Sequence, residues 1–398
     1  MVGLALLSYL FFQSIPAALL TSLIYAASPF TVYFDRMALA DSMLAMFGVW
    51  VLVFAKLFVD KRTLDWAMFT GITLGLALLT KSPAVFYFVW LALTFLFTIN
   101  LKNENKKSIS ILVLGFVYIF IISFALKSIL KLGPNSNMAG ERNLDYLYSF
   151  REILTHPLTP LIGNLKTTWS WLWYLITPST LLAAIYSFAE KKNIKKATLF
   201  LLLTLLPLIS QGLIAKVYTS RYILFTVYPL IILAGLGLSR LKAWVVAILI
   251  TVPLLLSVWY IYSPKNSPLP YDMATGYYQE WTAGWGQKEI AEYLINLHSQ
   301  GKKAVVFTEG FFGTLPDGLQ IYTQSYPNLT VVGSAPIAET LPDGLLNTSK
   351  DNERFFVINS TRNKLTASDL AKLELISEYP KFPRADGTHE SLQFFKLK

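Results

Sequence analysis

The stretch from Ser28 to Leu44, SPFTVYFDRMALADSML, places Asp35, Arg36 and Asp41 between two apolar segments. Charged side chains are costly within the hydrocarbon core of a membrane, and where they do occur they often mark substrate or ion pathways. The apolar flanks therefore predict membrane helices, and the charges predict a loop at the membrane surface.

The composition favours the same class of protein. Hydrophobic residues make up 54% of the 398 residues and charged residues only 15%, which is unusual for a water-soluble core. A net charge of +10 could also indicate nucleic-acid binding, but Lys and Arg cluster in short loops between apolar runs, as in membrane proteins. We therefore expect membrane lipids and no nucleic acid as partners. The chain has no cysteine, so it has no disulfide and no thiolate metal site.

The apolar runs predict about ten spanning helices, since each needs roughly 20 residues. One or two lie in the first 34 residues. The others are expected at 43–59, 65–80, 84–100, 108–130, 168–188, 197–215, 222–239 and 243–262. The expected fold class is thus mostly α, a polytopic transmembrane helix bundle.

The character of the chain changes near residue 263. Residues Met1–Ser263 hold 21 Lys and Arg against 9 Asp and Glu, whereas Pro264–Lys398 hold 13 against 15. In the second part, strand-like apolar runs alternate with helical patterns. The strand-like runs are 303–308, 329–333 and 354–359, and the helical patterns are 286–301 and 366–375. We predict a transmembrane domain over 1–262 and a small soluble α/β domain over 263–398.

Short basic loops set the expected orientation in the cell membrane. The positive-inside rule assigns loops rich in Lys and Arg to the cytoplasm; here these loops are 60–62, 102–107, 190–196 and 239–242. The other loops and the soluble domain are then extracytoplasmic. This arrangement gathers one set of charged residues at the outer face, with the soluble domain over them: Asp35, Arg36, Asp41, Lys81, Arg142, Arg151, Lys216 and Arg221.

The two carboxylates of this set, Asp35 and Asp41, are candidate catalytic groups. A carboxylate at a membrane face can accept the proton of an acceptor hydroxyl group. Asp41 could also hold a divalent cation such as Mg²⁺ or Mn²⁺. The structural alternative is an interfacial loop in which Arg36 simply pairs with Asp35 or Asp41.

Three cations of the set, Lys81, Arg221 and Arg36, are candidate phosphate ligands, together with Tyr222. Lys81 lies at a very short outer turn, where the positive-inside rule disfavours a lysine, and it can neutralise a phosphate as a point charge. Arg221 can bind a phosphate through two parallel hydrogen bonds. Alternatively, Lys81 extends toward lipid headgroups and Tyr222 belongs to an interfacial aromatic belt.

Three segments together resemble a known family. They are SPFTVYFDRMALADSML (28–44), LGLALLTKSPAVF (74–86) and YTSRYILFTVYPLIILAGLGL (218–238). They are similar to the GT-C membrane glycosyltransferases of the protein O-mannosyltransferase and aminoarabinose transferase type, and the resemblance covers roughly residues 1–262. It implies transfer of a sugar from a polyprenyl-phosphate donor to an extracytoplasmic acceptor.

The resemblance also implies roles for individual residues. In these enzymes the outer loop after the third helix supplies an acidic residue preceded by an arginine, which Asp41 and Arg36 match. A lysine after the fifth helix contacts the donor phosphate, and Lys81 matches it. An Arg-Tyr pair before a late helix is matched by Arg221 and Tyr222.

One family feature is expected to be missing. These enzymes carry an acidic residue in the loop between their first two helices, whereas the opening of this chain, MVGLALLSYLFFQSIP, resembles the end of their second helix. Without that loop, Asp35 or Asp41 would have to serve as the base. The alternative functions are a non-catalytic membrane scaffold or inactive fragment and a transporter of lipids or solutes.

Overall fold

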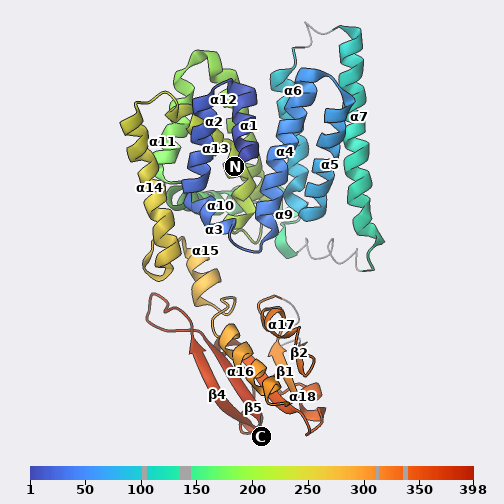
Figure 1. Cartoon of the computed structure of the whole chain (residues 1–398), viewed down its shortest axis with the longest axis vertical. Helices are drawn as coiled ribbons and strands as arrows, with labels where there is room; N and C mark the ends of the chain where they lie inside the picture. The colour runs from blue at the N-terminus through green and yellow to red at the C-terminus, as the bar shows by residue number, and fades with distance from the viewer. Residues whose placement is uncertain (101–104, 135–144, 311–312, 335–338) are drawn as a thin grey trace. The chain divides into compact units, whose positions relative to one another are not determined.

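The computed structural model of the chain describes residues 1–100, 105–134, 145–310, 313–334 and 339–398. Arg142 and part of the loop 102–107 lie outside these residues. Internal contacts divide the chain into two compact units, Met1–Pro268 and Leu269–Lys398. Each unit is drawn in Figure 1 and is described by itself.

The first unit is a bundle of helices. Its α-helices are α1 (Val2–Phe12), α2 (Ile15–Ala27), α3 (Pro29–Phe34), α4 (Ala40–Lys61), α5 (Leu64–Thr80), α6 (Phe86–Thr98), α7 (Lys106–Ser128), α9 (Phe150–Thr155), α10 (Leu158–Trp171), α11 (Pro178–Tyr186), α12 (Ile194–Ile214), α13 (Leu224–Leu238) and α14 (Ala243–Tyr262). Short 3₁₀ or π segments extend several of them: η1 (Ser82–Val85), η3 (Ile129–Leu132), η4 (Leu172–Ile176), η5 (Ser187–Ala189), η6 (Lys191–Asn193), η7 (Ser220–Ile223) and η8 (Pro264–Asn266).

Helices cover every apolar run that the sequence singled out, which confirms the predicted fold class. Within the described residues, five helices are long and apolar enough to cross a membrane: α4, α7, α12, α13 and α14, several with their short extensions. Four shorter apolar helices, α1, α2, α5 and α6, complete the bundle.

The expected single helix over 168–188 is interrupted, so this part of the prediction is wrong. The π-helical segment η4 ends at Ile176, Thr177 has a φ of 74°, and α11 begins at Pro178. The two parts meet at 96°. Proline disfavours a helical conformation in the residue before it, so Pro178 allows a sharp bend within a run that is apolar throughout.

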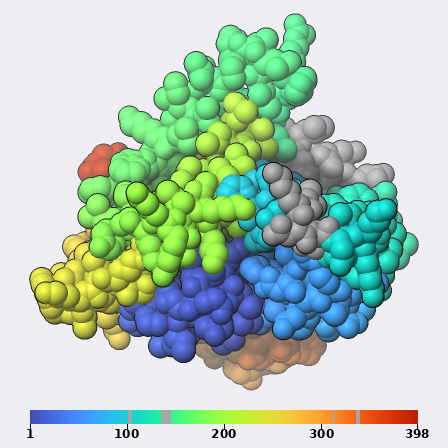
Figure 2. All heavy atoms as spheres, turned by 90° about the horizontal axis from the view of Figure 1, so that it is seen from above, coloured from blue at the N-terminus to red at the C-terminus, as the bar shows by residue number. Residues whose placement is uncertain are grey.

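The basic loops meet at one end of the bundle. Lys196 donates a 2.6 Å hydrogen bond to the carbonyl of Phe11, at the end of α1. At the same end, Lys56 in the last part of α4 lies 5.5 Å from the Phe11 ring centroid. Arg62, just after α4, donates to Ser108 at the start of α7. Figure 2 views the first unit from this end. The prediction that this end faces the cytoplasm remains a prediction.

Helix α13 lies at the centre of the bundle. All its residues from Leu224 to Leu238 are buried, and it packs against α2, α4, α11 and α12. Two glycines permit this close packing. A Cβ on Gly235 would lie 2.2 Å from the Thr21 hydroxyl oxygen, and one on Gly237 would lie 1.9 Å from the Ala183 carbonyl oxygen.

Replacing Gly237 with alanine should therefore destabilise the bundle. The new methyl group must displace the backbone of α11, and overpacking of this kind typically costs about 1–3 kcal/mol. Gly163, in α10, is the matched control, because a Cβ there meets nothing within 4 Å. Thermal unfolding in detergent should show a lower midpoint for Gly237→Ala and no loss for Gly163→Ala. Equal midpoints would contradict the packing described for α13.

The second unit is an α/β domain. Its sheet has the order β2-β1-β3-β5-β4, in which β2, β1 and β3 are parallel and β5 is antiparallel to β3 and β4. The strands are β1 (Ala304–Glu309), β2 (Leu329–Ser334), β3 (Glu353–Asn359), β4 (Leu373–Pro380) and β5 (Ser391–Leu397). The helical segments are α15 (Tyr271–Ala274), η9 (Thr275–Gln279), α16 (Gln287–Ser299), α17 (Asp317–Thr323), α18 (Asp343–Asn347), η10 (Ser360–Arg362) and α19 (Ala367–Leu370).

Apolar side chains on both faces of the sheet explain its buried strands. Along β3, Phe355 and Val357 join a core with α16 and α17, whereas Phe356 and Ile358 join a core with Leu345 of α18. This alternation follows from the two-residue period of a strand. The α/β fold and the three expected strands are confirmed. The helical pattern at 366–375 is correct only for α19, because Leu373–Pro380 forms the edge strand β4.

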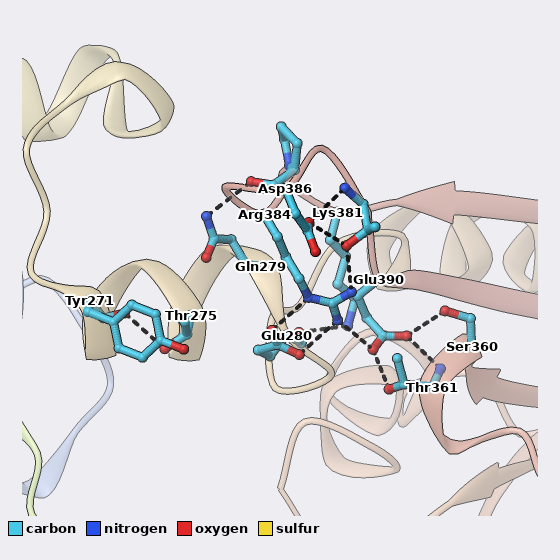
Figure 3. Close-up of polar contacts among 12 residues, drawn as sticks. Tyr271, Thr275, Gln279, Glu280, Ser360, Thr361, Lys381, Arg384, Asp386 and Glu390 are labelled. Carbon is cyan, nitrogen blue, oxygen red and sulfur yellow. Dashed lines mark hydrogen bonds and ion pairs between the residues drawn. The ribbon is translucent and has the colours of Figure 1, made fainter.

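A polar cluster joins the start of this domain to the hairpin of β4 and β5. Arg384 donates 2.8 and 2.9 Å hydrogen bonds to the two carboxylate oxygens of Glu280 (Figure 3). The buried Lys381 ammonium donates to the carbonyls of Glu280 and Trp281 at 3.2 and 3.1 Å and to the Asn359 side chain at 2.5 Å. Burial lowers the pKa of Lys381 to about 8.

The buried Glu390 carboxylate belongs to the same cluster. It accepts hydrogen bonds from the hydroxyl groups of Ser360 and Thr361 and from the Thr361 amide, as Figure 3 shows. These bonds outweigh the effect of burial and lower its pKa. Because the charged groups in the cluster bind one another and the backbone, we assign the cluster a structural role.

Candidate active site

An ion pair between Asp41 and Lys81 forms the first part of the candidate site. Asp41 is the second residue of α4, and Lys81 directly follows α5. The Lys81 ammonium lies 2.5 Å from a carboxylate oxygen of Asp41, whose side chain is only 5% exposed. Two residues forty positions apart therefore meet at the end of the bundle opposite the basic loops, because α4 and α5 run antiparallel and side by side.

The 3₁₀ turn η7 adds Arg221 and Tyr222 to this pair. The Lys81 ammonium lies 4.5 Å from the centroid of the Tyr222 ring, and the Arg221 guanidinium lies 5.4 Å from the same centroid. Both cations thus flank one aromatic ring. Burial lowers the pKa of Lys81, the attraction of Asp41 opposes this shift, and the nearby Arg221 charge adds to it.

The group holds two cations and one carboxylate. Lys81 and Arg221 are cationic, and Asp41 is the carboxylate paired with Lys81. Buried or half-buried cations that share one neighbourhood repel each other and gain energy when an anion binds between them. The arrangement therefore suits a phosphate or another anion.

Asp35 lies in different surroundings. It directly follows α3 and lines a cavity of about 450 Å³ together with Tyr25, Ser42 and Tyr228. The Tyr25 hydroxyl donates to one carboxylate oxygen of Asp35. The other oxygen is buried and has no hydrogen-bond partner among the described residues. A carboxylate oxygen of this kind is available to accept a proton from a bound hydroxyl group.

The remaining cavity wall is mainly apolar and comes from two helices. The start of α1 and one face of α4 supply it: Met1, Gly3, Leu4, Met43, Met46, Val49 and Trp50. Met43 and Met46 are exposed on the outside of the bundle. A molecule with an apolar part could therefore reach Asp35 along α4.

Arg36 does not join either group. Its side chain is exposed, and no ion pair between Arg36 and Asp35 or Asp41 occurs in the described structure. Among the described residues, neither this alternative pairing of Arg36 nor a contact with Lys81 or Arg221 occurs. Lys216, also expected at this face, lies 3.7 Å from Glu152 and 5.5 Å from the Tyr148 ring centroid.

The residues around Asp41 do not fit a metal site. Divalent cations such as Mg²⁺ or Mn²⁺ need several oxygen ligands. Within the described ranges, no three His, Asp or Glu side chains come together in a way that could hold a metal ion. The Lys81 ammonium already compensates the charge of Asp41, so we assign no step to a metal.

Sequence reasoning missed Tyr25 and Tyr228. Both lie within apolar helices, where a tyrosine is easily attributed to packing. The one available signal was the presence of a hydroxyl group in a buried segment, because a buried tyrosine hydroxyl normally has a hydrogen-bond partner. That signal does not identify Asp35 as the partner.

Comparisons with known proteins agree with this architecture. Residues 1–126 match the family model of dolichyl-phosphate-mannose-protein mannosyltransferases. No curated protein matches the sequence. The crystal structure of ArnT from Cupriavidus metallidurans in the apo state has a similar fold, with a TM-score of 0.55 and 16% sequence identity. The superposition covers 99% of this chain and 81% of the ArnT chain. Together these findings support a membrane glycosyltransferase. The chain has a GT-C-like fold, and its first 126 residues are similar to the protein mannosyltransferase family.

Proposed function

We propose that this chain transfers a sugar from a polyprenyl-phosphate-linked donor to an extracytoplasmic acceptor, which is a lipid, a glycan or a protein. The observation that carries the proposal is the group of Lys81, Arg221 and Asp41 at one end of a membrane bundle, in which both cations flank the Tyr222 ring and Lys81 also pairs with Asp41. A lipid-linked phosphate stays at the membrane surface while its lipid remains in the bilayer. It can therefore reach both cations.

In the proposed reaction, an acceptor hydroxyl attacks the anomeric carbon of the donor sugar. The bond from that carbon to the phosphate oxygen breaks, and polyprenyl phosphate leaves with the electron pair. Asp35 accepts the hydroxyl proton, because it lines a cavity and one of its oxygens has no hydrogen-bond partner among the described residues, whereas Asp41 is paired with Lys81. Lys81 and Arg221 stabilise the charge that develops on the leaving phosphate.

The purified full chain should release polyprenyl phosphate when it receives a suitable donor and an acceptor. The measurement is a panel of polyprenyl-phosphate-linked hexoses and pentoses in liposomes, with lipid, glycan and peptide acceptors. Release that depends on the acceptor would support the proposal. A folded protein that shows no turnover with any combination would count against it.

We also propose that the second unit is extracytoplasmic, since the basic loops favour this orientation. The chain contains no cysteine, so a single introduced cysteine reports on one position. Ser299 in the second unit and Thr63 between α4 and α5 are both exposed. In intact cells, a membrane-impermeant maleimide should label Ser299→Cys and not Thr63→Cys. The reverse labelling would show the opposite orientation.

A further inference from the structure

A second cavity lies at the end of the bundle where the basic loops meet. The start of α1 lines the Asp35 cavity, whereas the last residues of α1 line this one, so the two cavities lie toward opposite ends of α1. Its volume is about 810 Å³. The walls are the turn between α1 and α2, the segment from Tyr186 to Asn193, and the end of α13.

The polar wall of this cavity carries two cations and one carboxylate. Arg240 donates a 2.6 Å hydrogen bond to Glu190 and a 3.1 Å bond to the carbonyl of Ser187. Lys192 lies 2.9 Å from the other oxygen of Glu190. Glu190 also accepts a 2.8 Å hydrogen bond from Asn193. The carboxylate is thus fully engaged, and one excess positive charge remains in the wall.

The surroundings increase this positive character. The segment that contains Lys192 also contains Lys191, Lys195 and Lys196. Of these four lysines, Lys192 is the one among the lining residues of the cavity, and its side chain is 77% exposed, so it can bind an incoming anion. An anion bound to Lys192 is also attracted by the positive charge of Arg240. The hydrogen bond to the Ser187 carbonyl holds the Arg240 side chain in place.

The rest of the wall is apolar or aromatic and open to the outside. Tyr9, Ile15 and Tyr186 line the cavity and are all exposed. In Figure 2, which looks onto this end, the blue segment of α1 and α2 adjoins the yellow-green segment around residue 190. A ligand for this site therefore needs an anionic group for Lys192 and Arg240 and an apolar part for the exposed rim.

We infer that this cavity binds the headgroup of an anionic phospholipid in the leaflet at the basic end of the bundle. Basic pockets between membrane helices on the cytoplasmic side commonly bind such headgroups. The phosphate would lie against Lys192 and Arg240, and the acyl chains would pass Ile15 and Tyr186 into the bilayer. The inference does not depend on sugar transfer, because the site lies away from Asp35 and Lys81.

The test is native mass spectrometry of the full chain, released from nanodiscs with equal amounts of phosphatidylglycerol and phosphatidylcholine. The wild-type protein should retain phosphatidylglycerol in preference to phosphatidylcholine. Lys192→Gln should lower that retention about fivefold, the contribution of one cation near an anionic surface. Ala189→Trp keeps every charge but fills the cavity, and should abolish the preference.

Lys242→Gln is the matched control. It removes one charge at the same end of the bundle, from an exposed residue that does not line the cavity. Its retention of phosphatidylglycerol should equal that of the wild type, and the melting temperature should confirm that each variant is folded. Equal retention of the two lipids by the wild type would overturn the inference. Unchanged retention of phosphatidylglycerol in both Lys192→Gln and Ala189→Trp would also overturn it. The same holds if Lys242→Gln lost as much retention as Lys192→Gln.

Discussion

Replacing Lys81 with methionine should abolish sugar transfer and also destabilise the protein. The Asp41 carboxylate is 5% exposed and would lose the cation that lies 2.5 Å away. Removing one partner of a buried ion pair costs about 3–5 kcal/mol, because it leaves an uncompensated buried charge. The loss of a cation that stabilises the leaving phosphate should lower the rate by about 10²–10³.

A double variant separates the two effects. Asp41→Asn together with Lys81→Met removes both charges, so the melting temperature should return close to that of the wild type. Transfer should stay abolished, as measured by the initial rate of polyprenyl-phosphate release. Lys216→Met is the control, because Lys216 follows α12 at the same end of the bundle as Lys81 and its ion pair with Glu152 is long and exposed. If the double variant kept more than about a tenth of the wild-type activity, Lys81 would not be needed to stabilise the leaving phosphate.

Replacing Asp35 with asparagine should leave the fold and donor binding intact and stop transfer. Asparagine keeps the size of the side chain and can still accept a hydrogen bond from Tyr25, but it cannot take up a proton. The loss of a general base typically lowers a rate by about 10²–10⁴. The measurement combines the transfer rate with competition binding of polyprenyl phosphate, which should not change.

Two further variants define the role of Asp35. Tyr25→Phe removes the hydroxyl that holds the carboxylate, so it should lower the rate less than Asp35→Asn does. Asp60→Asn is the matched control, because Asp60 is an exposed carboxylate that pairs with Lys56 near the basic end. Transfer by Asp35→Asn within about tenfold of the wild type would assign the base to another group.

The sequence predicted much of the fold because hydropathy and charge report on insertion into a membrane. Apolar runs gave the positions of the helices, and the placement of basic loops predicted that Asp41, Lys81 and Arg221 share one end. The structure brings these three residues together. The break at Pro178 was missed because a bend does not change the hydropathy of an apolar run. The edge strand β4 was missed because a short segment of mixed polarity can match both the helical and the strand periodicity.

The details of the candidate site could not be predicted in the same way. Hydropathy gives the length of a helix but does not determine which side chains of neighbouring helices meet. The Tyr25–Asp35 bond depends on how α2 packs beside the end of α3. Arg36 and Asp35 are adjacent in the sequence, yet Arg36 is exposed whereas Asp35 lines a cavity.

The burial of α13 has a consequence for which substitutions the chain can tolerate. In α14 most side chains are exposed on the outside of the bundle, and lipid tails accept almost any apolar shape. In α13 every position meets protein, so even a change from one aliphatic residue to another alters the fit. These two apolar helices should therefore differ sharply in their mutational tolerance. Apolar substitutions should be tolerated on the exposed face of α14 and on no face of α13.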